Sequence, residues 1–296
     1  MKIKDIFLFE RIMSFGERHP VVKPLLPSFF YLKKKTKKLI KSKKFYFEVT
    51  ATEHCNLHCA MCSHYSPLAN ESYINIQEME RDIKRLKELF EGYELTCCIL
   101  GGEPLLHPDI DKIMNICREA MPYAHLQLCT NGILLKKMPP QFWASLHDND
   151  VKLIISSYPI YLDYDWILQK AKESGVNKVD RENAIITGFT KNIINREVGN
   201  GRRNSIVCDA HHRSHTLSHG KLYTCHCAAN IHIFNQHFNE HFPEDNGVDI
   251  YTAESAKSLL CQMGKPCALC AYCRPEKYIV KPWAHSAKDI CEWLDE

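Results

Sequence analysis

A short run of three cysteines places the strongest constraint on how this chain can fold. Cys55, Cys59 and Cys62 follow a C-x3-C-x2-C spacing, directly after the apolar, strand-like segment 45–49. Three thiolates on one short loop can hold three irons of a cubane [4Fe–4S] cluster, because cysteine thiolate is the usual protein ligand of such clusters. The fourth iron then lacks a protein ligand and offers an open coordination position, as a catalytic zinc ion does. The spacing therefore predicts a reactive iron–sulfur centre on a loop at the end of a strand.

A zinc site is the main alternative for this loop. Zinc takes four ligands, and His54, His58 and His64 are close enough in the sequence to supply the fourth. A disulfide framework is disfavoured, because 15 cysteines is an odd number and the N-terminus shows no signal peptide. Cysteine clusters without a secretory signal favour metal over disulfides, so we expect a metal centre and a cytoplasmic location.

A second motif lies one strand further along the chain. The apolar segment 95–100 leads directly into a Gly-Gly-Glu-Pro turn that starts at Gly101, and an amphipathic helix is expected over 76–90. These segments complete a strand–helix–strand unit. Two glycines allow the backbone to approach a ligand closely, and Glu103 offers a carboxylate. An ordinary turn is the alternative, and the position one strand after the cysteine loop disfavours it.

Together, these two motifs resemble the radical SAM superfamily, and the resemblance covers most of the chain from about Phe45 onward. It implies that the open iron binds S-adenosylmethionine through the amino and carboxylate groups of that molecule. It also implies that Gly101, Gly102 and Glu103 bind the methionyl amino group. The chain departs from the family pattern at Met61, where an aromatic residue often packs near the adenine. Methionine is flexible and polarisable enough to fill the same space.

The alternation of strands and helices continues beyond these motifs. We expect helices and strands in turn at 108–120 (helix), 125–132 (a strand that ends in a turn), 139–146 (helix), 151–157 (strand) and 164–174 (helix). Such alternation is typical of a parallel sheet covered by helices, that is, of an α/β fold. The resemblance implies a partial (β/α)6 TIM-like barrel with a small cysteine-rich C-terminal extension.

Polar residues at the ends of two expected strands are further site candidates. Sites in such barrels gather at the C-terminal ends of the strands. Thr130, Asn131 and Ser156 lie at such ends, and we interpret them as cofactor or substrate contacts. A purely local role in capping the strands and forming turns is the alternative.

The last third of the chain holds a second group of cysteines. Cys208 and Cys225 form a C-x11-G-x4-C pattern, and three more cysteines follow within 267–273. This arrangement resembles the SPASM and twitch extensions of radical SAM enzymes, which carry auxiliary iron–sulfur clusters. The full SPASM pattern is missing, so the resemblance implies a shorter, twitch-like domain with one cluster. The preferred ligands are Cys208, Cys225, Cys270 and Cys273, with Cys267 in reserve and Cys227, Cys261 and Cys291 as weaker candidates.

Other cysteines and histidines have simpler interpretations. A structural zinc ion on the same four preferred ligands is the alternative to an auxiliary cluster. Eight of the 16 histidines fall within 211–241, His226 among them, and each is interpreted as an ordinary surface or loop residue, although some could line the pocket. Four cysteines in apolar patterns are interpreted as small core residues, namely Cys97, Cys98, Cys117 and Cys129.

The composition fits one large and one small domain. A chain of 296 residues that is 45% hydrophobic can bury enough core for both, and no apolar run reaches the length of a membrane span. We predict a basic, aromatic-rich extension over 1–44, a radical SAM core barrel over 45–200 and an auxiliary-cluster domain over 201–296. The lysine-rich part of the extension is interpreted as a solvated linker or helix face, with peripheral membrane contact as the alternative.

The expected activity is the one that the resemblance implies. An external one-electron donor such as flavodoxin or ferredoxin reduces the cluster, S-adenosylmethionine is cleaved, and the resulting 5′-deoxyadenosyl radical removes hydrogen from the substrate. Segments 62–69 and 220–225 resemble radical SAM proteins of surface polysaccharide assembly, which implies a sugar or nucleotide-sugar substrate and no nucleic acid partner. Modification of a ribosomally made peptide is the alternative, and a non-catalytic zinc-binding scaffold is the alternative from another class.

Overall fold

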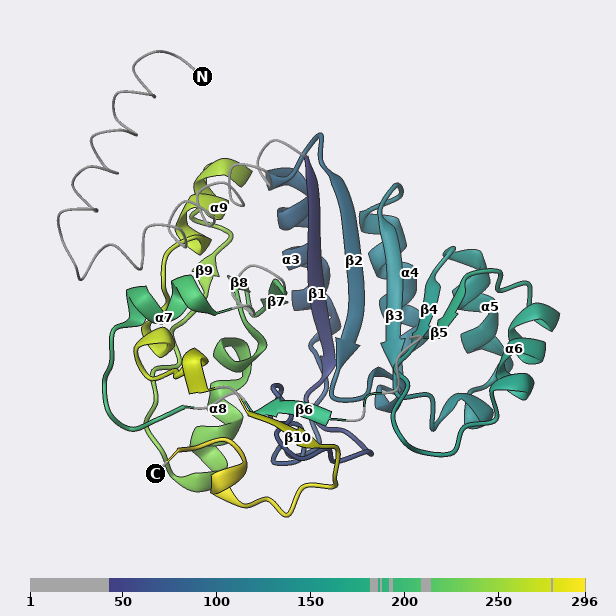
Figure 1. Ribbon diagram of the computed structural model, residues 1–296. Helices are drawn as coiled ribbons and strands as arrows, with labels where there is room; N and C mark the ends of the chain where they lie inside the picture. The colour runs from purple at the N-terminus through teal and green to yellow at the C-terminus, as the bar shows by residue number, and fades with distance from the viewer. Residues whose placement is uncertain are drawn as a thin grey trace, which may run out of the picture.

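One large sheet organises the chain. The computed structural model describes residues 43–181, 186, 188–191, 194–208, 214–277 and 279–295, so nearly all of the predicted N-terminal extension lies outside the described residues. The sheet has eight strands in the order β5-β4-β3-β2-β1-β7-β8-β9 (Figure 1). These strands are β1 (Lys44–Thr52), β2 (Glu94–Gly101), β3 (His125–Thr130), β4 (Lys152–Ile155), β5 (Val179–Arg181), β7 (Thr216–Ser218), β8 (Lys221–Tyr223) and β9 (Val248–Asp249).

Strands β1 to β5 follow one another across the sheet in parallel, as the alternation of elements predicts. The helices that connect them are α3 (Ile76–Leu89), α4 (Ile110–Ala120), α5 (Pro140–Asp148) and α6 (Tyr164–Glu173). Side chains of Asn75 and Asp163 cap the first turns of α3 and α6, respectively. The α/β class with a parallel, helix-covered sheet is therefore confirmed.

The sixth parallel strand comes from an unexpected part of the chain. Strand β7 pairs in parallel with β1, at the opposite edge from β5, and β8 and β9 continue the sheet with antiparallel pairing. The predicted C-terminal extension therefore adds its own strands to the barrel sheet. A separate two-stranded sheet pairs β6 (Gly188–Lys191) with β10 (Ile279–Pro282).

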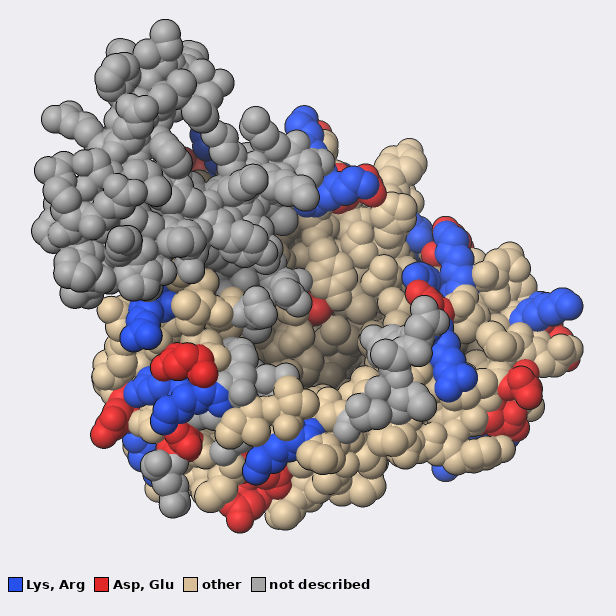
Figure 2. Space-filling model, in the orientation of Figure 1, with Lys and Arg blue, Asp and Glu red and all other residues tan. Residues whose placement is uncertain are grey.

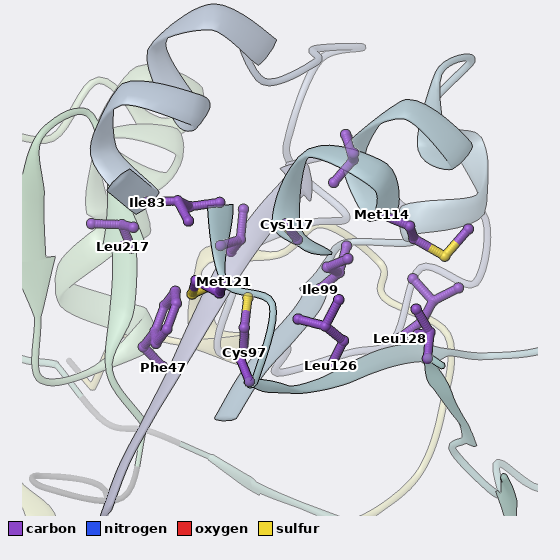
Figure 3. Close-up of a cluster of buried hydrophobic side chains, with 14 of the residues drawn as sticks. Phe47, Ile83, Cys97, Ile99, Met114, Cys117, Met121, Leu126, Leu128 and Leu217 are labelled. Carbon is purple, nitrogen blue, oxygen red and sulfur yellow. The ribbon is translucent and has the colours of Figure 1, made fainter. Parts of the chain in front are cut away.

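Alternate residues of β1 face the main hydrophobic core. Phe45, Phe47 and Val49 are at most 2% exposed and pack against the helices, because successive strand residues point to opposite faces. Figure 3 shows this core, with Cys97 and Cys117 among the aliphatic side chains, as predicted for both. Burial of each large apolar side chain contributes about 1.5–3 kcal/mol. The opposite face of β1 is left for polar residues.

A second core holds the C-terminal region together. The helices of this region are α7 (Gly201–Val207), α8 (His226–Phe238) and α9 (Ala256–Met263), of which α9 packs on the main core instead. Its short 3-10 turns include η4 (Ala268–Ala271), η5 (Pro275–Lys277) and η6 (Ile290–Glu292). The barrel part has two more such turns, η2 (Pro104–Leu106) and η3 (Leu135–Lys137). Tyr65, from the segment after the cysteine loop, packs here with Phe234 and Trp293. The cysteine loop is therefore anchored to the C-terminal region. Among the described residues, no helix is long and apolar enough to span a membrane.

Candidate functional site

One cavity of about 210 Å³ brings together every site residue predicted in the barrel. It lies at the C-terminal ends of strands β1 to β4, and the face shown in Figure 2 is hollowed over β1 and β2, with mostly uncharged walls. A second cavity, of about 250 Å³, is lined by residues that include Glu53, Asp82 and His219 and contains none of the predicted site residues. The predicted residues lining the first cavity are Cys55, Cys59, Cys62, Gly101, Gly102, Glu103, Thr130, Asn131 and Ser156.

The cysteine loop is tightly wound where it leaves β1. His58, Met61 and Tyr65 adopt positive φ angles of 50°, 59° and 54°, a conformation that costs an L-residue roughly 1–2 kcal/mol. Cys59 is 6% exposed, whereas Cys55 and Cys62 are partly exposed. The surrounding structure must therefore stabilise this loop, since three strained residues fall within or beside the C-x3-C-x2-C run.

Burial holds the loop thiols in their protonated form when no cation is near. Desolvation raises the pKa of Cys55 to about 12 and that of Cys59 to about 12. N–H donors already point at the sulfurs, because the Leu57 amide lies 3.4 Å from Cys55 Sγ and the Trp283 indole nitrogen lies 3.2 Å from Cys59 Sγ. A metal centre supplies the positive charge that such thiols need to ionise, so the donor set fits an iron–sulfur cluster.

The two glycines after β2 are required by a backbone contact. The β1–β2 pairing is irregular between Thr50 and Thr52, and the Gly102 amide donates to the Thr52 carbonyl at 2.8 Å. A Cβ atom on Gly101 would lie 2.2 Å from the Thr52 oxygen, and one on Gly102 would lie 2.1 Å from the His54 oxygen. The structure thus gives these glycines a reason that differs from the expected approach to a ligand: the Gly-Gly-Glu turn closes on the backbone at the start of the cysteine loop.

Glu103 is a buried carboxylate held by the neighbouring strand end. It is 1% exposed and accepts hydrogen bonds from Thr130 Oγ1 at 2.5 Å, Asn131 N at 2.8 Å and Leu105 N at 3.1 Å. Burial raises the pKa of the Glu103 carboxyl to about 7, although these hydrogen bonds act in the opposite direction. A cationic group in the cavity would favour the ionised form. Glu103 is therefore suited to bind an ammonium group.

The polar strand-end residues serve both of the roles considered for them. Thr130 Oγ1 accepts from the Gly132 amide, and Asn131 Oδ1 accepts from the Ile133 amide, which are local turn contacts. The same residues line the cavity, and Asn131 Nδ2 also lies 3.8 Å from Cys55 Sγ. Ser156 Oγ lies 3.5 Å from the sulfur of Cys129. Cys129 lines the cavity too, so its interpretation as a plain core residue was incomplete.

A buried polar group on the inner face of β1 escaped the sequence analysis. Glu48 is 4% exposed, and its carboxylate lies 2.5 Å from His226 Nε2 and accepts from the Tyr46 hydroxyl at 2.9 Å. Burial opposes ionisation of Glu48, but the hydrogen bond and charge of His226 lower its pKa overall. His226, which lines the cavity, is thus no ordinary surface histidine. A glutamate inside an apolar strand, with Tyr46 two residues before it, was the available signal.

His226 also connects the two cysteine groups. Its ring stacks on that of His64 with centroids 4.1 Å apart. His64 follows Cys62 by two residues, and His226 directly follows Cys225. The end of the cysteine loop and the start of α8 therefore lie side by side.

The second cysteine group gathers around α8 and η4. Cys267 Sγ lies 3.5 Å from Cys270 Sγ, and a hydrogen bond from Cys227 lowers the pKa of Cys225. Cys273 interacts electrostatically with Cys208, Cys225 and Cys267. Cys261 and Cys291 are exposed. Among the described residues, no three His, Cys, Asp or Glu side chains converge tightly enough to hold one metal ion, and the ligand set of this group stays a prediction.

Comparison with known proteins adds three similarities. A GTP 3',8-cyclase of Nautilia profundicola is 32% identical over 92 residues, which cover 31% of this chain and 29% of that protein. A 7,8-dihydro-6-hydroxymethylpterin dimethyltransferase of Methanocaldococcus jannaschii is 32% identical over 133 residues, which cover 44% of this chain and 24% of that protein. The crystal structure of BtrN in complex with AdoMet and 2-DOIA covers 77% of this chain and 92% of its own, at 14% identity and a TM-score of 0.47.

The match to these curated relatives spans less than a third of their length. Residues 49–163 match the Radical SAM superfamily. This segment begins on β1 and contains the cysteine loop, the Gly-Gly-Glu turn and the strand ends that line the cavity. Through this segment, the chain is similar to the radical SAM superfamily.

Proposed function

We propose that this chain is a radical SAM enzyme. Cys55, Cys59 and Cys62 would hold a [4Fe–4S] cluster, and the turn 101–103 would bind S-adenosylmethionine beside it. The observation that carries the proposal is that these residues, from the ends of two neighbouring strands, line a single cavity. The match of residues 49–163 to the Radical SAM superfamily supports both cofactors.

The donor set of the cavity supports this assignment. When bound, the cluster and S-adenosylmethionine supply a reductive cleavage that yields methionine and a 5′-deoxyadenosyl radical, with the electron taken from an external donor such as flavodoxin or ferredoxin. The Glu103 carboxylate would accept hydrogen bonds from the methionyl ammonium group. Thr130 Oγ1 and the Asn131 amide, which donate to the same carboxylate, would keep Glu103 oriented.

A hydroxylated small molecule is the substrate that we propose, specifically a sugar or nucleotide sugar of glycan assembly. His226 in the cavity wall, backed by Glu48, offers hydrogen-bonding partners for hydroxyl groups. Two curated relatives are named for GTP and for a pterin, which supports a small molecule over the alternative, a ribosomally made peptide. A free nucleotide is the second candidate, because one of these relatives is a GTP cyclase.

We further propose that residues 45–200 form the core barrel and that residues 201–296 carry an auxiliary [4Fe–4S] cluster. Cys208, Cys225, Cys270 and Cys273 remain the preferred ligands, with a structural zinc ion as the alternative. The proximity of Cys273 to Cys208 and Cys225 supports this grouping. We also propose a reducing, cytoplasmic location, because cysteine clusters that hold metal are typical of such compartments.

The test is anaerobic reconstitution with iron and sulfide, followed by reduction with dithionite in the presence of S-adenosylmethionine. For wild type, we expect about eight irons per chain and formation of 5′-deoxyadenosine. For Cys59→Ala, we expect no 5′-deoxyadenosine. About four irons with the same product would leave the second cysteine group to zinc. Zinc without iron or sulfide, and no 5′-deoxyadenosine, would refute the enzyme and support the scaffold. Product formation above the uncoupled rate when nucleotide sugars, nucleotides or peptides are added would then separate the substrate classes.

A further inference from the structure

A C-terminal segment, residues 283–293, lies along the cysteine loop although more than 220 residues separate them in sequence. Figure 1 shows β10, which leads into this segment, at the end of β1 where the cysteine loop begins. Hydrogen bonds join the two segments along the loop, namely His285 Nδ1 to Leu57 O (3.0 Å), Ser286 N to His58 O (2.8 Å), Ala60 N to Ala284 O (2.9 Å), Met61 N to Glu292 Oε2 (3.3 Å) and Trp293 Nε1 to Cys62 O (2.9 Å).

One contact between these segments reaches a sulfur atom rather than the backbone. The indole N–H of Trp283 donates to Cys59 Sγ at 3.2 Å. The backbone is fixed on both sides of Trp283, because Pro282 ends β10 in register with Gly188 and the Ala284 carbonyl accepts from Ala60. The donor is therefore held in place by the sheet on one side and by the cysteine loop on the other.

The aromatic surroundings further restrict the indole ring. Its centroid lies 4.9 Å from that of His285 and 6.4 Å from that of Tyr158, a cavity-lining residue. Cys59 itself is 6% exposed, so water has little access to its sulfur. A hydrogen bond in such a low-dielectric place acts on the charge of its acceptor more strongly than it would in water.

A donor to a cysteine ligand changes how readily an iron–sulfur cluster takes up an electron. One-electron reduction adds one negative charge, which spreads over the irons and their sulfur ligands. Hydrogen bonds to those sulfurs stabilise the added charge, and they are among the factors that set the reduction potential of such clusters.

We propose that Trp283 is a positioning residue that raises the reduction potential of the cluster at Cys55, Cys59 and Cys62 through its hydrogen bond to the Cys59 sulfur. This inference rests on the proposed function, because it requires that cluster. It also links reduction to the C-terminal segment: the cluster accepts an electron from its external donor most readily when residues 283–293 lie against the cysteine loop.

The test compares the full-length Trp283→Phe variant with wild type after anaerobic reconstitution. Phenylalanine keeps an aromatic ring and removes the N–H donor. We expect a more negative midpoint potential in a redox titration of the reduced-cluster EPR signal. At the wild-type midpoint, the ratio of reduced to oxidised cluster should fall severalfold, where a tenfold fall corresponds to about 59 mV for one electron. An unchanged midpoint in a variant with the wild-type iron content would overturn the inference.

Trp293→Phe is the matched control, because it removes an indole donor to the loop backbone at Cys62 O and leaves the donor to the sulfur in place. Its midpoint should stay at the wild-type value, and an equal shift in both variants would mean that loop packing, not the sulfur contact, sets the potential. If Trp283→Phe fails to retain iron, replacement of Trp283 by 3-benzothienylalanine keeps the indole shape without its N–H, and the same shift is expected. Failure of wild type to bind iron would instead refute the proposed function.

Discussion

The two cysteine groups differ in how far their spacing determines their geometry. Cys55, Cys59 and Cys62 occupy one short loop, and all three line one cavity together with the ends of β2, β3 and β4. The cysteines of the second group come from three separate segments: the end of α7, the start of α8 and residues 267–273. Only the tertiary fold brings these segments together. Spacing thus specifies a ligand set when one loop carries every ligand, and specifies much less when the ligands come from separate segments.

The thiols of the two groups also differ in their partners. In the first group, N–H donors such as the Leu57 amide and the Trp283 indole point at the sulfurs. In the second group, thiols contact one another, as Cys267 contacts Cys270 at 3.5 Å. The first group therefore borders an open cavity, whereas members of the second group contact one another.

Removal of a ligand from the first group should reduce activity more than any other change proposed here. A small effect would show that the two cysteine groups do not differ as described. Cys62→Ala leaves two loop thiolates for the cluster, so we expect 5′-deoxyadenosine formation to fall by more than the roughly 100-fold that outer-shell changes at metal sites cost. The product is measured by chromatography after reduction with dithionite. Cys261→Ala is the control, because Cys261 is exposed on α9 and does not line the cavity, and this variant should retain wild-type iron and activity. Full activity of Cys62→Ala would show that the loop is not the cluster site.

The second group can be tested with a pair of neighbouring cysteines. Cys270→Ala should lose about four of about eight irons and keep the first cluster, because a cubane cluster depends on its cysteine ligands. Cys267→Ala should retain them, since Cys267 is the reserve ligand. Iron and sulfide analysis with EPR distinguishes the two variants. The reverse pattern would exchange the roles of these cysteines, and retention in both would remove the 270 and 267 positions from the ligand set.

Glu103 allows the first site to be tested without iron. Its pKa of about 7 in the folded state exceeds the ordinary value of 4.5, so the folded state binds the proton more tightly than the unfolded state. Stability of the apo-protein should therefore fall as pH rises from about 4.5 through about 7, by about 3 kcal/mol from this group. Urea unfolding of wild type and E103Q across this range measures the difference, which E103Q should abolish. Parallel pH profiles for the two proteins would contradict the assignment.

Much of the barrel could be predicted because its signals are local. The apolar alternation of β1 and β2, the periodicity of α3 and the glycine pair after β2 each act within a few residues, and the structure has these elements where they were expected. The cavity follows from them, since parallel strands end at one edge of the sheet.

The remaining features depend on contacts between distant segments. Glu48 contacts His226 because β7 pairs with β1 at the edge of the parallel strands and so brings α8, which begins at His226, close to β1. Trp283 reaches Cys59 only because β10 pairs with β6. Neither pairing leaves a periodic pattern in the sequence, so neither residue could be recognised as part of the site. The role of the glycines in closing on the backbone of β1 is of the same kind.

The contact of Gly102 with the backbone of the cysteine loop gives the smallest expected effect. It can be used to distinguish a steric clash from conformational strain. Gly102→Ala would place a Cβ 2.1 Å from the His54 carbonyl oxygen, so the turn must move away from the start of the cysteine loop, at about 2 kcal/mol. Gly92→Ala is the matched control: Gly92 has φ +77° with nothing near its Cβ position, so only conformational strain of about 1 kcal/mol is expected. Urea unfolding of the apo-proteins measures both. Of these two glycines, Gly102 alone lies beside the start of the cysteine loop, so only the Gly102 variant should also bind less iron. Equal iron binding by the two variants would show that the first site tolerates movement of the turn that is proposed to bind S-adenosylmethionine.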